Sequence, residues 1–185
     1  PRGAGELMRK ALARIEAIVR DLQPRVGGGP GEARPIDLRA LVDQIVKEKE
    51  LELSSHSSGV KISLEVRSDE ALFVQGDEAQ LARAISNLIN NSIEAKTDKA
   101  AEIEIRLHKD GQRVLLQIAD NGTGFSPLAL EKALDYGFSE AKDSGSGTGL
   151  SHALQVAKSC GGNLTIANHE QGAVVSMELP ATQGN

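Results

Sequence analysis

Three short segments rich in glycine, asparagine and aspartate constrain this chain most, because one fold must bring them together across long stretches of sequence. They are residues 87–94 (NLINNSIE), 120–125 (DNGTGF) and 145–150 (GSGTGL), in that order. They offer an amide that can bind a hard metal ion, a carboxylate after a predicted strand, and a glycine-rich loop before a predicted helix. Together these are parts of an ATP site.

The composition sets broad limits on fold and partners. Of the 185 residues, 39% are hydrophobic and 25% are charged, which is ordinary for one soluble globular domain with a small appendage. The net charge of -5, without a lysine or arginine cluster, argues against a nucleic-acid partner. No apolar run approaches the roughly 20 residues that span a bilayer, so we expect no membrane contact by this chain. We expect a cytoplasmic location, although the parent protein can itself be membrane-anchored. The single cysteine, Cys160, excludes an internal disulfide.

Residues 1–24 are predicted to form one helix of the kind that packs in bundles. Their apolar residues recur at spacings of four and three: Met8, Leu12, Ile15, Val19 and Leu22. Pro24 ends this pattern, and the glycine- and proline-rich residues 25–35 are predicted as a linker before a main domain at 36–182. A lone helix with so much apolar surface needs a partner from a second copy, another segment or the following domain.

Beyond residue 36 the apolar pattern changes repeatedly between the period of a helix and that of a strand. The predicted order is helix 38–53, strands 60–66 and 71–74, helix 77–96, hairpin 103–118, short helix 127–136, helix 148–159, and strands near 164 and at 173–179. Asp77 with Gln80 resembles a capping box at the start of the second helix. Because hairpins and helices are mixed, we predict an α/β (α+β) two-layer sandwich: a mixed, mostly antiparallel sheet with helices on one face.

The helix at 77–96 carries a polar stripe opposite its apolar face. Asn87, Asn91 and Glu94 lie on that stripe at helical spacing. Taken alone, this stripe is an ordinary solvated face. An asparagine amide oxygen is, however, a neutral hard ligand suited to Mg²⁺ whose other positions are filled by phosphate oxygens and water.

The segment 120–125 directly follows a predicted strand, which places Asp120 at a strand end. A carboxylate there can accept a hydrogen bond from the exocyclic amine of adenine. Gly122 and Gly124 allow the backbone to approach a base closely. Taken alone, the same residues also fit a simple turn.

The segment 145–150 precedes a helical pattern and lacks both the P-loop and the Rossmann spacing. Gly145, Gly147 and Gly149 free backbone amides to point at an anion, and the helix N-terminus adds a favourable dipole. Taken alone, the segment also fits a flexible linker. The residues between 125 and 145 then form a flap, in which Lys142 is the cation best placed for phosphate; a solvated surface lysine is the plainer alternative.

The order and spacing of the three segments resemble the N, G1 and G2 boxes of the GHKL (Bergerat) ATP-binding fold, specifically the catalytic domain of sensor histidine kinases, over about residues 36–180. The resemblance implies ATP and Mg²⁺ as cofactors, with Asn91 as the metal ligand and Asp120 as the adenine-binding residue. It implies a catalytic role for Asn87, Asn91 and Lys142. The remaining nucleotide-binding positions that it implies are Gly122, Gly124, Phe138, Gly145, Gly147, Thr148, Gly149 and Leu150.

The same resemblance implies a histidine protein kinase of a two-component system that transfers the γ-phosphate of ATP to a histidine. Residues 14–22 resemble the second helix of the family's dimerisation and phosphotransfer hairpin, and the first helix, which carries the acceptor, is not seen. None of the four histidines, His56, His108, His152 and His169, fits the acceptor pattern. We therefore expect a chain that is inactive alone, with three partners: an acceptor helix of the same parent in cis or in trans, a response regulator, and a second copy bound through the N-terminal helix.

Two residues depart from the family pattern. Glu94 stands where these kinases often carry a basic residue. Asn87 stands where the ATPase branch of the superfamily uses a glutamate to activate water, so we expect slow hydrolysis and positioning for transfer. Two alternatives remain open: a serine-phosphorylating switch kinase of the anti-sigma type, and a non-catalytic pseudokinase that only binds nucleotide.

Overall fold

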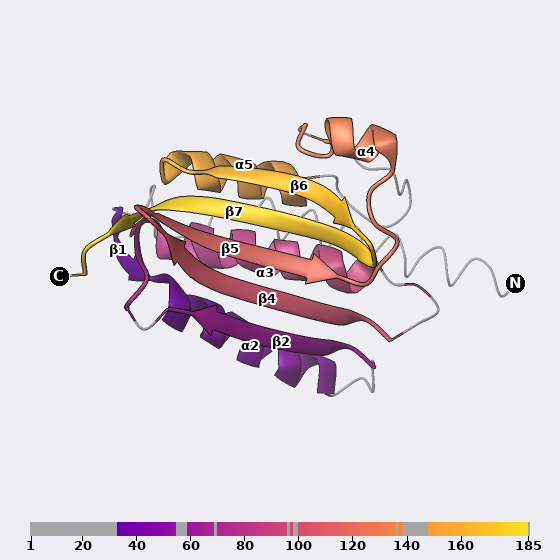
Figure 1. The fold of residues 1–185 in the computed structure, drawn as a ribbon, viewed down its shortest axis with the longest axis horizontal. Coiled ribbons are helices and arrows are strands. Elements are labelled where there is room, and N and C mark those ends of the chain that lie inside the picture. Colours follow the sequence, from indigo (N-terminus) through magenta and orange to yellow (C-terminus); the bar gives the residue numbers. More distant parts are fainter. Residues whose placement is uncertain are drawn as a thin grey trace, which may run out of the picture.

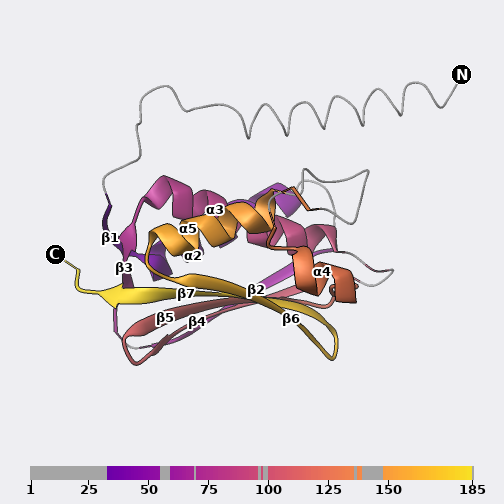
Figure 2. The same cartoon turned by 90° about the horizontal axis from the view of Figure 1, so that it is seen from above.

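The computed structural model describes residues 33–54, 59–68, 70–95, 97, 100–135, 137–138 and 148–184. Within these residues the chain forms one sheet of seven strands with a layer of helices on one face (Figures 1 and 2). The predicted helix at 1–24, most of the linker, and Lys142, Gly145 and Gly147 lie outside the described residues.

The sheet has the order β1-β3-β7-β5-β4-β2, with β6 also paired to β7. Its strands are β1 (Arg34–Asp37), β2 (Lys61–Arg67), β3 (Phe73–Gly76), β4 (Glu102–Asp110), β5 (Arg113–Asp120), β6 (Asn163–His169) and β7 (Gly172–Thr182). The β2–β4 pair is parallel and the other pairs are antiparallel. The predicted mixed, mostly antiparallel sheet is therefore confirmed.

Strand β1 was not predicted. It begins at Arg34, two residues before the expected domain start, and pairs with β3 at the edge of the sheet. Its four residues include Pro35, which an edge strand tolerates because one side of the strand makes no ladder. A strand this short, with a single buried apolar side chain at Ile36, leaves no alternating pattern to detect.

The described helices are α2 (Leu38–Ser54), α3 (Glu78–Glu94), α4 (Pro127–Lys132) and α5 (Gly149–Ser159). Helices α2, α3 and α5 cover one face of the sheet, as predicted, and α4 lies at one end of it (Figure 2). Helix α4 ends at Lys132, earlier than its predicted end near 136. Among the described residues, no helix has the length and apolar character needed to cross a membrane.

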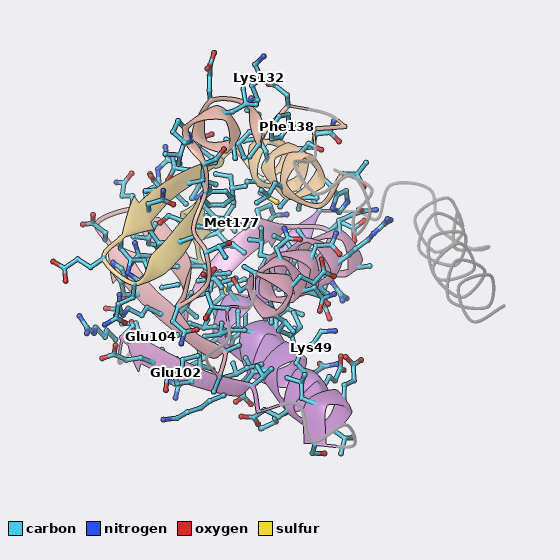
Figure 3. All side chains as sticks on the ribbon, turned by 90° about the vertical axis from the view of Figure 1, so that its right-hand side faces the viewer. Lys49, Glu102, Glu104, Lys132, Phe138 and Met177 are labelled. Atoms are coloured by element: carbon cyan, nitrogen blue, oxygen red, sulfur yellow. The ribbon has the colours of Figure 1, made fainter. Side chains whose placement is uncertain are left out.

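The core lies between the sheet and the helices. The alternating residues of β4 and β5 bury one face of each strand, and Met177 of β7 is fully buried in the same layer (Figure 3). Helix α3 supplies the opposing buried face, which is apolar except for Ser92: Leu81, Ala84, Ile85, Leu88, Ile89 and Ser92. Because one face of α3 is committed to the core, its polar stripe must point away from it.

Helix α3 begins at the predicted cap. The Asp77 carboxylate accepts hydrogen bonds from the backbone N–H of Ala79 at 2.9 Å and of Gln80 at 3.2 Å. The side-chain oxygen of Gln80 lies 3.3 Å from Nε2 of His152 on α5. This contact joins the first turns of the two helices that carry the candidate site.

Candidate functional site

Helix α3 places Asn87 and Asn91 one turn apart on its polar stripe, both partly buried. The first residue of α5, Gly149, packs directly against them. A methyl group at position 149 would lie 3.4 Å from both side-chain amide atoms of Asn91 and 3.9 Å from Cβ of Asn87. The two asparagines and the last glycine of the predicted phosphate loop, 58 positions beyond Asn91 in sequence, therefore lie side by side.

The start of α5 is held by one local hydrogen bond and by contact with the core. Thr148 is its N-cap residue, and Oγ of Ser151 donates a hydrogen bond to the Thr148 carbonyl at 3.1 Å. Leu150 is half-buried and packs against the hydrophobic core, which fixes the direction of the helix. The backbone N–H groups at a helix N-terminus and the helix dipole favour negative charge, and here that end of α5 lies beside Asn91.

Asp120 is the last residue of β5 and is only 6% exposed. Its Oδ1 atom accepts hydrogen bonds from the backbone N–H of Gly122 at 2.9 Å and of Ala173 at 3.3 Å. Among the described residues, no protein group donates to Oδ2 of this carboxylate. The strand therefore holds a buried carboxylate in one orientation, with one oxygen available to a ligand.

The loop that follows Asp120 is bound to α3 and β4. The backbone N–H of Thr123 donates to the carbonyl of Ala95, the C-cap of α3, at 3.1 Å, and Ala95 in turn donates to the carbonyl of Asn91. A Cβ at Gly122 would lie 2.3 Å from the Ala95 oxygen, so a side chain is excluded there. The Asn121 amide holds the start of β4 through two backbone hydrogen bonds. The loop that carries Asp120 is thus bound to the end of α3 that carries Asn91.

Two predicted positions are less closely tied to this site. Gly124 has a φ of +70°, so the loop uses the left-handed backbone that glycine favours. Phe138 is half-buried, and its N–H donates to the Asp135 carbonyl at 3.3 Å just after α4 (Figure 3). Among the described residues, Phe138 makes no hydrogen bond to the loop at 120–125, and its role in the site stays a prediction.

The sequence analysis missed the contribution of the β6–β7 hairpin. Asn168 binds both backbone groups of Phe125, accepting from its N–H at 2.8 Å and donating to its carbonyl at 2.7 Å. Nε2 of His169 lies 3.0 Å from the Asp120 carbonyl. Two polar residues at a strand end are usual before a turn. Because Asn168 and His169 contact residues more than 40 positions away in sequence, no local pattern predicts these contacts.

Glu94 is exposed by surface area, but nearby protein atoms partly desolvate its carboxyl, and this desolvation raises the pKa of the carboxyl above the ordinary value. A raised folded-state pKa means that the group's stabilising contribution is complete below the unfolded pKa and is lost as the pH rises through the folded pKa. We therefore expect Glu94→Gln to unfold at a higher temperature than the unaltered chain at pH 7, with the difference shrinking toward pH 4. Thermal unfolding followed by circular dichroism across this range measures the effect.

Glu50→Gln is the matched control, because it removes one negative charge from an exposed position on another helix of 17 residues. The raised pKa of Glu94 would be contradicted if the change in unfolding temperature of Glu94→Gln did not depend on pH, or if Glu50→Gln showed the same change.

A family model described as histidine kinase-, DNA gyrase B-, and HSP90-like ATPase matches residues 76–183, which is more than half of the chain. The chain belongs to this family. The match begins just before α3 and includes Asn87, Asn91, Asp120 and the start of α5, so it covers every element that builds the site.

The chain is also similar to longer bacterial proteins. It is 26% identical to sporulation kinase B of Bacillus subtilis (strain 168) over 177 residues, which are 95% of this chain and 40% of that protein. It is 35% identical to the C4-dicarboxylate transport sensor protein DctB of Pseudomonas aeruginosa over 115 residues, which are 60% of this chain and 19% of that protein. The chain thus spans less than half the length of these relatives.

Solved structures confirm the fold. The catalytic domain of histidine kinase ThkA matches with a TM-score of 0.73 at 22% identity, covering 82% of this chain and 97% of that one. Full-length ShkA in complex with AMPPNP matches with a TM-score of 0.75 at 24% identity, covering all of this chain and 40% of that one. The fold is that of sensor histidine kinase catalytic domains, as the resemblance of the three segments predicted.

Proposed function

We propose that this chain binds ATP with Mg²⁺ and transfers the γ-phosphate to a histidine side chain that another segment of its parent protein presents. The observation that carries the proposal is the packing of Asn91 on α3 against Gly149 at the start of α5, with the Asp120 loop bound one turn further along α3. The described parts of three segments distant in sequence lie close together there, which supports a nucleotide site.

Each residue has a distinct part in this proposal. Oδ2 of Asp120 would accept a hydrogen bond from the adenine amine, while Gly122 and Gly124 let the backbone approach the base. The amide oxygen of Asn91 would hold Mg²⁺, which when bound neutralises phosphate charge. The first turn of α5, from Thr148 to Leu150, would donate backbone N–H groups to phosphate oxygens.

The segment between α4 and α5 would complete the proposed site. Gly145 and Gly147 would extend the phosphate loop that Gly149 ends, and Lys142 would stabilise the charge that develops on the transferred phosphoryl group. Phe138 would pack beside the nucleotide. These four roles rest on the family resemblance, because Lys142, Gly145 and Gly147 lie outside the described residues and the one printed hydrogen bond of Phe138 goes to Asp135.

Phosphoryl transfer is favoured over hydrolysis by the chemistry of Asn87. This residue lies one turn before Asn91 and beside Gly149, where the ATPase branch of the superfamily has a glutamate base. An amide cannot take a proton from water at neutral pH. The site therefore positions the phosphate and leaves the nucleophile to an incoming acceptor helix.

Because the acceptor comes from outside this domain, the proposed function requires partners. A solved structure shows ThkA in complex with the response regulator protein TrrA, and the chain matches that kinase with a TM-score of 0.75 at 21% identity. We propose that the parent of this chain likewise passes its phosphate to a response regulator, and that it forms a homodimer through the helix at 1–24. The domain would work in the cytoplasm, where ATP is available.

The proposal predicts that the chain will phosphorylate the parent's acceptor hairpin in trans. The chain, Mg²⁺ and ATP labelled at the γ-phosphate are mixed with a purified fragment that carries this hairpin, and the label on the fragment is tested in acid and in base. Phosphohistidine is labile in acid and stable in base, so that pattern is the expected result. The same fragment with its histidine replaced by glutamine is the control and should remain unlabelled.

Other outcomes select the alternatives. Label that is stable in acid and labile in base indicates the serine kinase. No label, with ATP binding intact, indicates a pseudokinase.

A further inference from the structure

The β6–β7 hairpin holds both ends of the loop that carries Asp120. At one end, Nε2 of His169 lies 3.0 Å from the Asp120 carbonyl, and the Ala173 N–H reaches the Asp120 carboxylate at 3.3 Å. At the other end, the Asn168 amide makes its two hydrogen bonds to Phe125. Neighbouring residues of one strand thus fix the first and last residues of the segment DNGTGF.

The tautomer of His169 is set by its neighbours. The Gln171 backbone N–H lies 3.4 Å from Nδ1, which can only accept there, so Nε2 carries the hydrogen and donates to the Asp120 carbonyl. This bond fixes the backbone of Asp120 while the N–H groups of Gly122 and Ala173 fix its side chain. The carboxylate is therefore oriented from both sides.

Close backbone approach reinforces this arrangement. A Cβ at Gly172, the first residue of β7, would lie 2.2 Å from the Asp120 carbonyl oxygen and 2.8 Å from the Gly122 nitrogen. A side chain at 172 would push the hairpin away from the loop. At the far end, Oδ1 of Asn168 lies 3.0 Å from the place where a Cβ at Gly124 would be, so the amide also confines the turn before Phe125.

From these contacts we propose that Asn168 and His169 are positioning residues of the nucleotide site, which set the orientation of Asp120 and the shape of the loop that receives the adenine base. The inference rests on the proposed function, because it assigns a role in binding ATP. It concerns the adenine end of the site and not the phosphate end, since the hairpin contacts the Asp120 loop and the phosphate end is built by α3 and α5.

The test measures ATP affinity by titration calorimetry and the unfolding temperature without nucleotide, both on the 185-residue chain. Asn168→Leu keeps a similar volume and removes both bonds to Phe125, so ATP should bind about tenfold more weakly. His169→Ala should weaken binding about threefold, and His169→Gln, which keeps a donor near the Asp120 carbonyl, should restore most of the affinity. Thr165→Ala, at an exposed position on the same strand, is the matched control and should bind as the unaltered chain does.

A double-mutant cycle separates positioning from general stability. If His169 acts through Asp120, the effect of His169→Ala on affinity should largely disappear in the Asp120→Asn background, whereas a merely structural effect would persist there. Unaltered affinity in both Asn168→Leu and His169→Ala would overturn the proposal. If Asn168→Leu unfolds, the His169→Ala and His169→Gln pair decides in the same way.

The two proposals fail differently. If the unaltered chain does not bind ATP, the proposed function fails. If it binds ATP and Asp120→Asn weakens that binding while the hairpin variants do not, only the inference about Asn168 and His169 is wrong.

Discussion

Asp120→Asn is expected to lower ATP affinity about a hundredfold, because it turns an acceptor of a charge-assisted hydrogen bond into an amide whose N–H₂ would face the adenine amine. The substitution keeps the shape of the side chain. The carbonyl oxygen of asparagine can still accept from the Gly122 and Ala173 N–H groups that hold Oδ1 now, so the loop should keep its fold. Titration calorimetry with ATP and Mg²⁺ measures the loss.

The matched control is Asp110→Asn at the other end of the β4–β5 hairpin. Asp110 is exposed and opposite Arg113, whereas Asp120 ends β5 and pairs with Ile103. Asp110→Asn should bind ATP normally, and both variants should unfold at temperatures close to that of the unaltered chain. Normal affinity in Asp120→Asn would remove Asp120 from the site and with it the assignment of the adenine pocket.

The elements with strong periodicity could be predicted from sequence. The alternation in 103–118 and the apolar stripe of α3 each place one face of the element in the core. A shifted strand register or a rotated helix would expose that whole face to solvent, so the pattern allows one arrangement. Strand β1 could not be found this way. It exists because β3 offers an edge to pair with, and its own four residues carry almost no pattern.

In the candidate site, too, some features could be predicted from the sequence and others could not. Asn91, Asp120 and Gly149 belong to segments whose local chemistry is unusual, and the structure places position 149 beside the Asn91 side chain. The two hydrogen bonds between the Asn168 amide and the Phe125 backbone form only because the fold brings β6 next to the 120–125 loop. The sequence around Asn168 does not predict this contact, because a polar residue before a turn is common in many structures.

Asn91→Ala is expected to reduce phosphotransfer to the acceptor hairpin about a thousandfold, since it would remove the proposed amide ligand for Mg²⁺ and with it much of the charge neutralisation that phosphoryl transfer needs. Its effect on nucleotide binding should depend on the metal. The unaltered chain should bind ATP more tightly with Mg²⁺ than with EDTA, and the variant should bind equally under both conditions. Labelled transfer and calorimetry in the two buffers measure these quantities.

Asn90→Ala is the matched control for this prediction. Asn90 is the same residue type on the same helix, one position earlier, and therefore about 100° around the axis from Asn91. It lies off the stripe that meets Gly149, so Asn90→Ala should keep both transfer and the dependence on Mg²⁺. If Asn91→Ala kept the metal dependence of ATP binding, the metal would be held elsewhere, and the contact between Asn91 and Gly149 would serve only to pack α5 on α3.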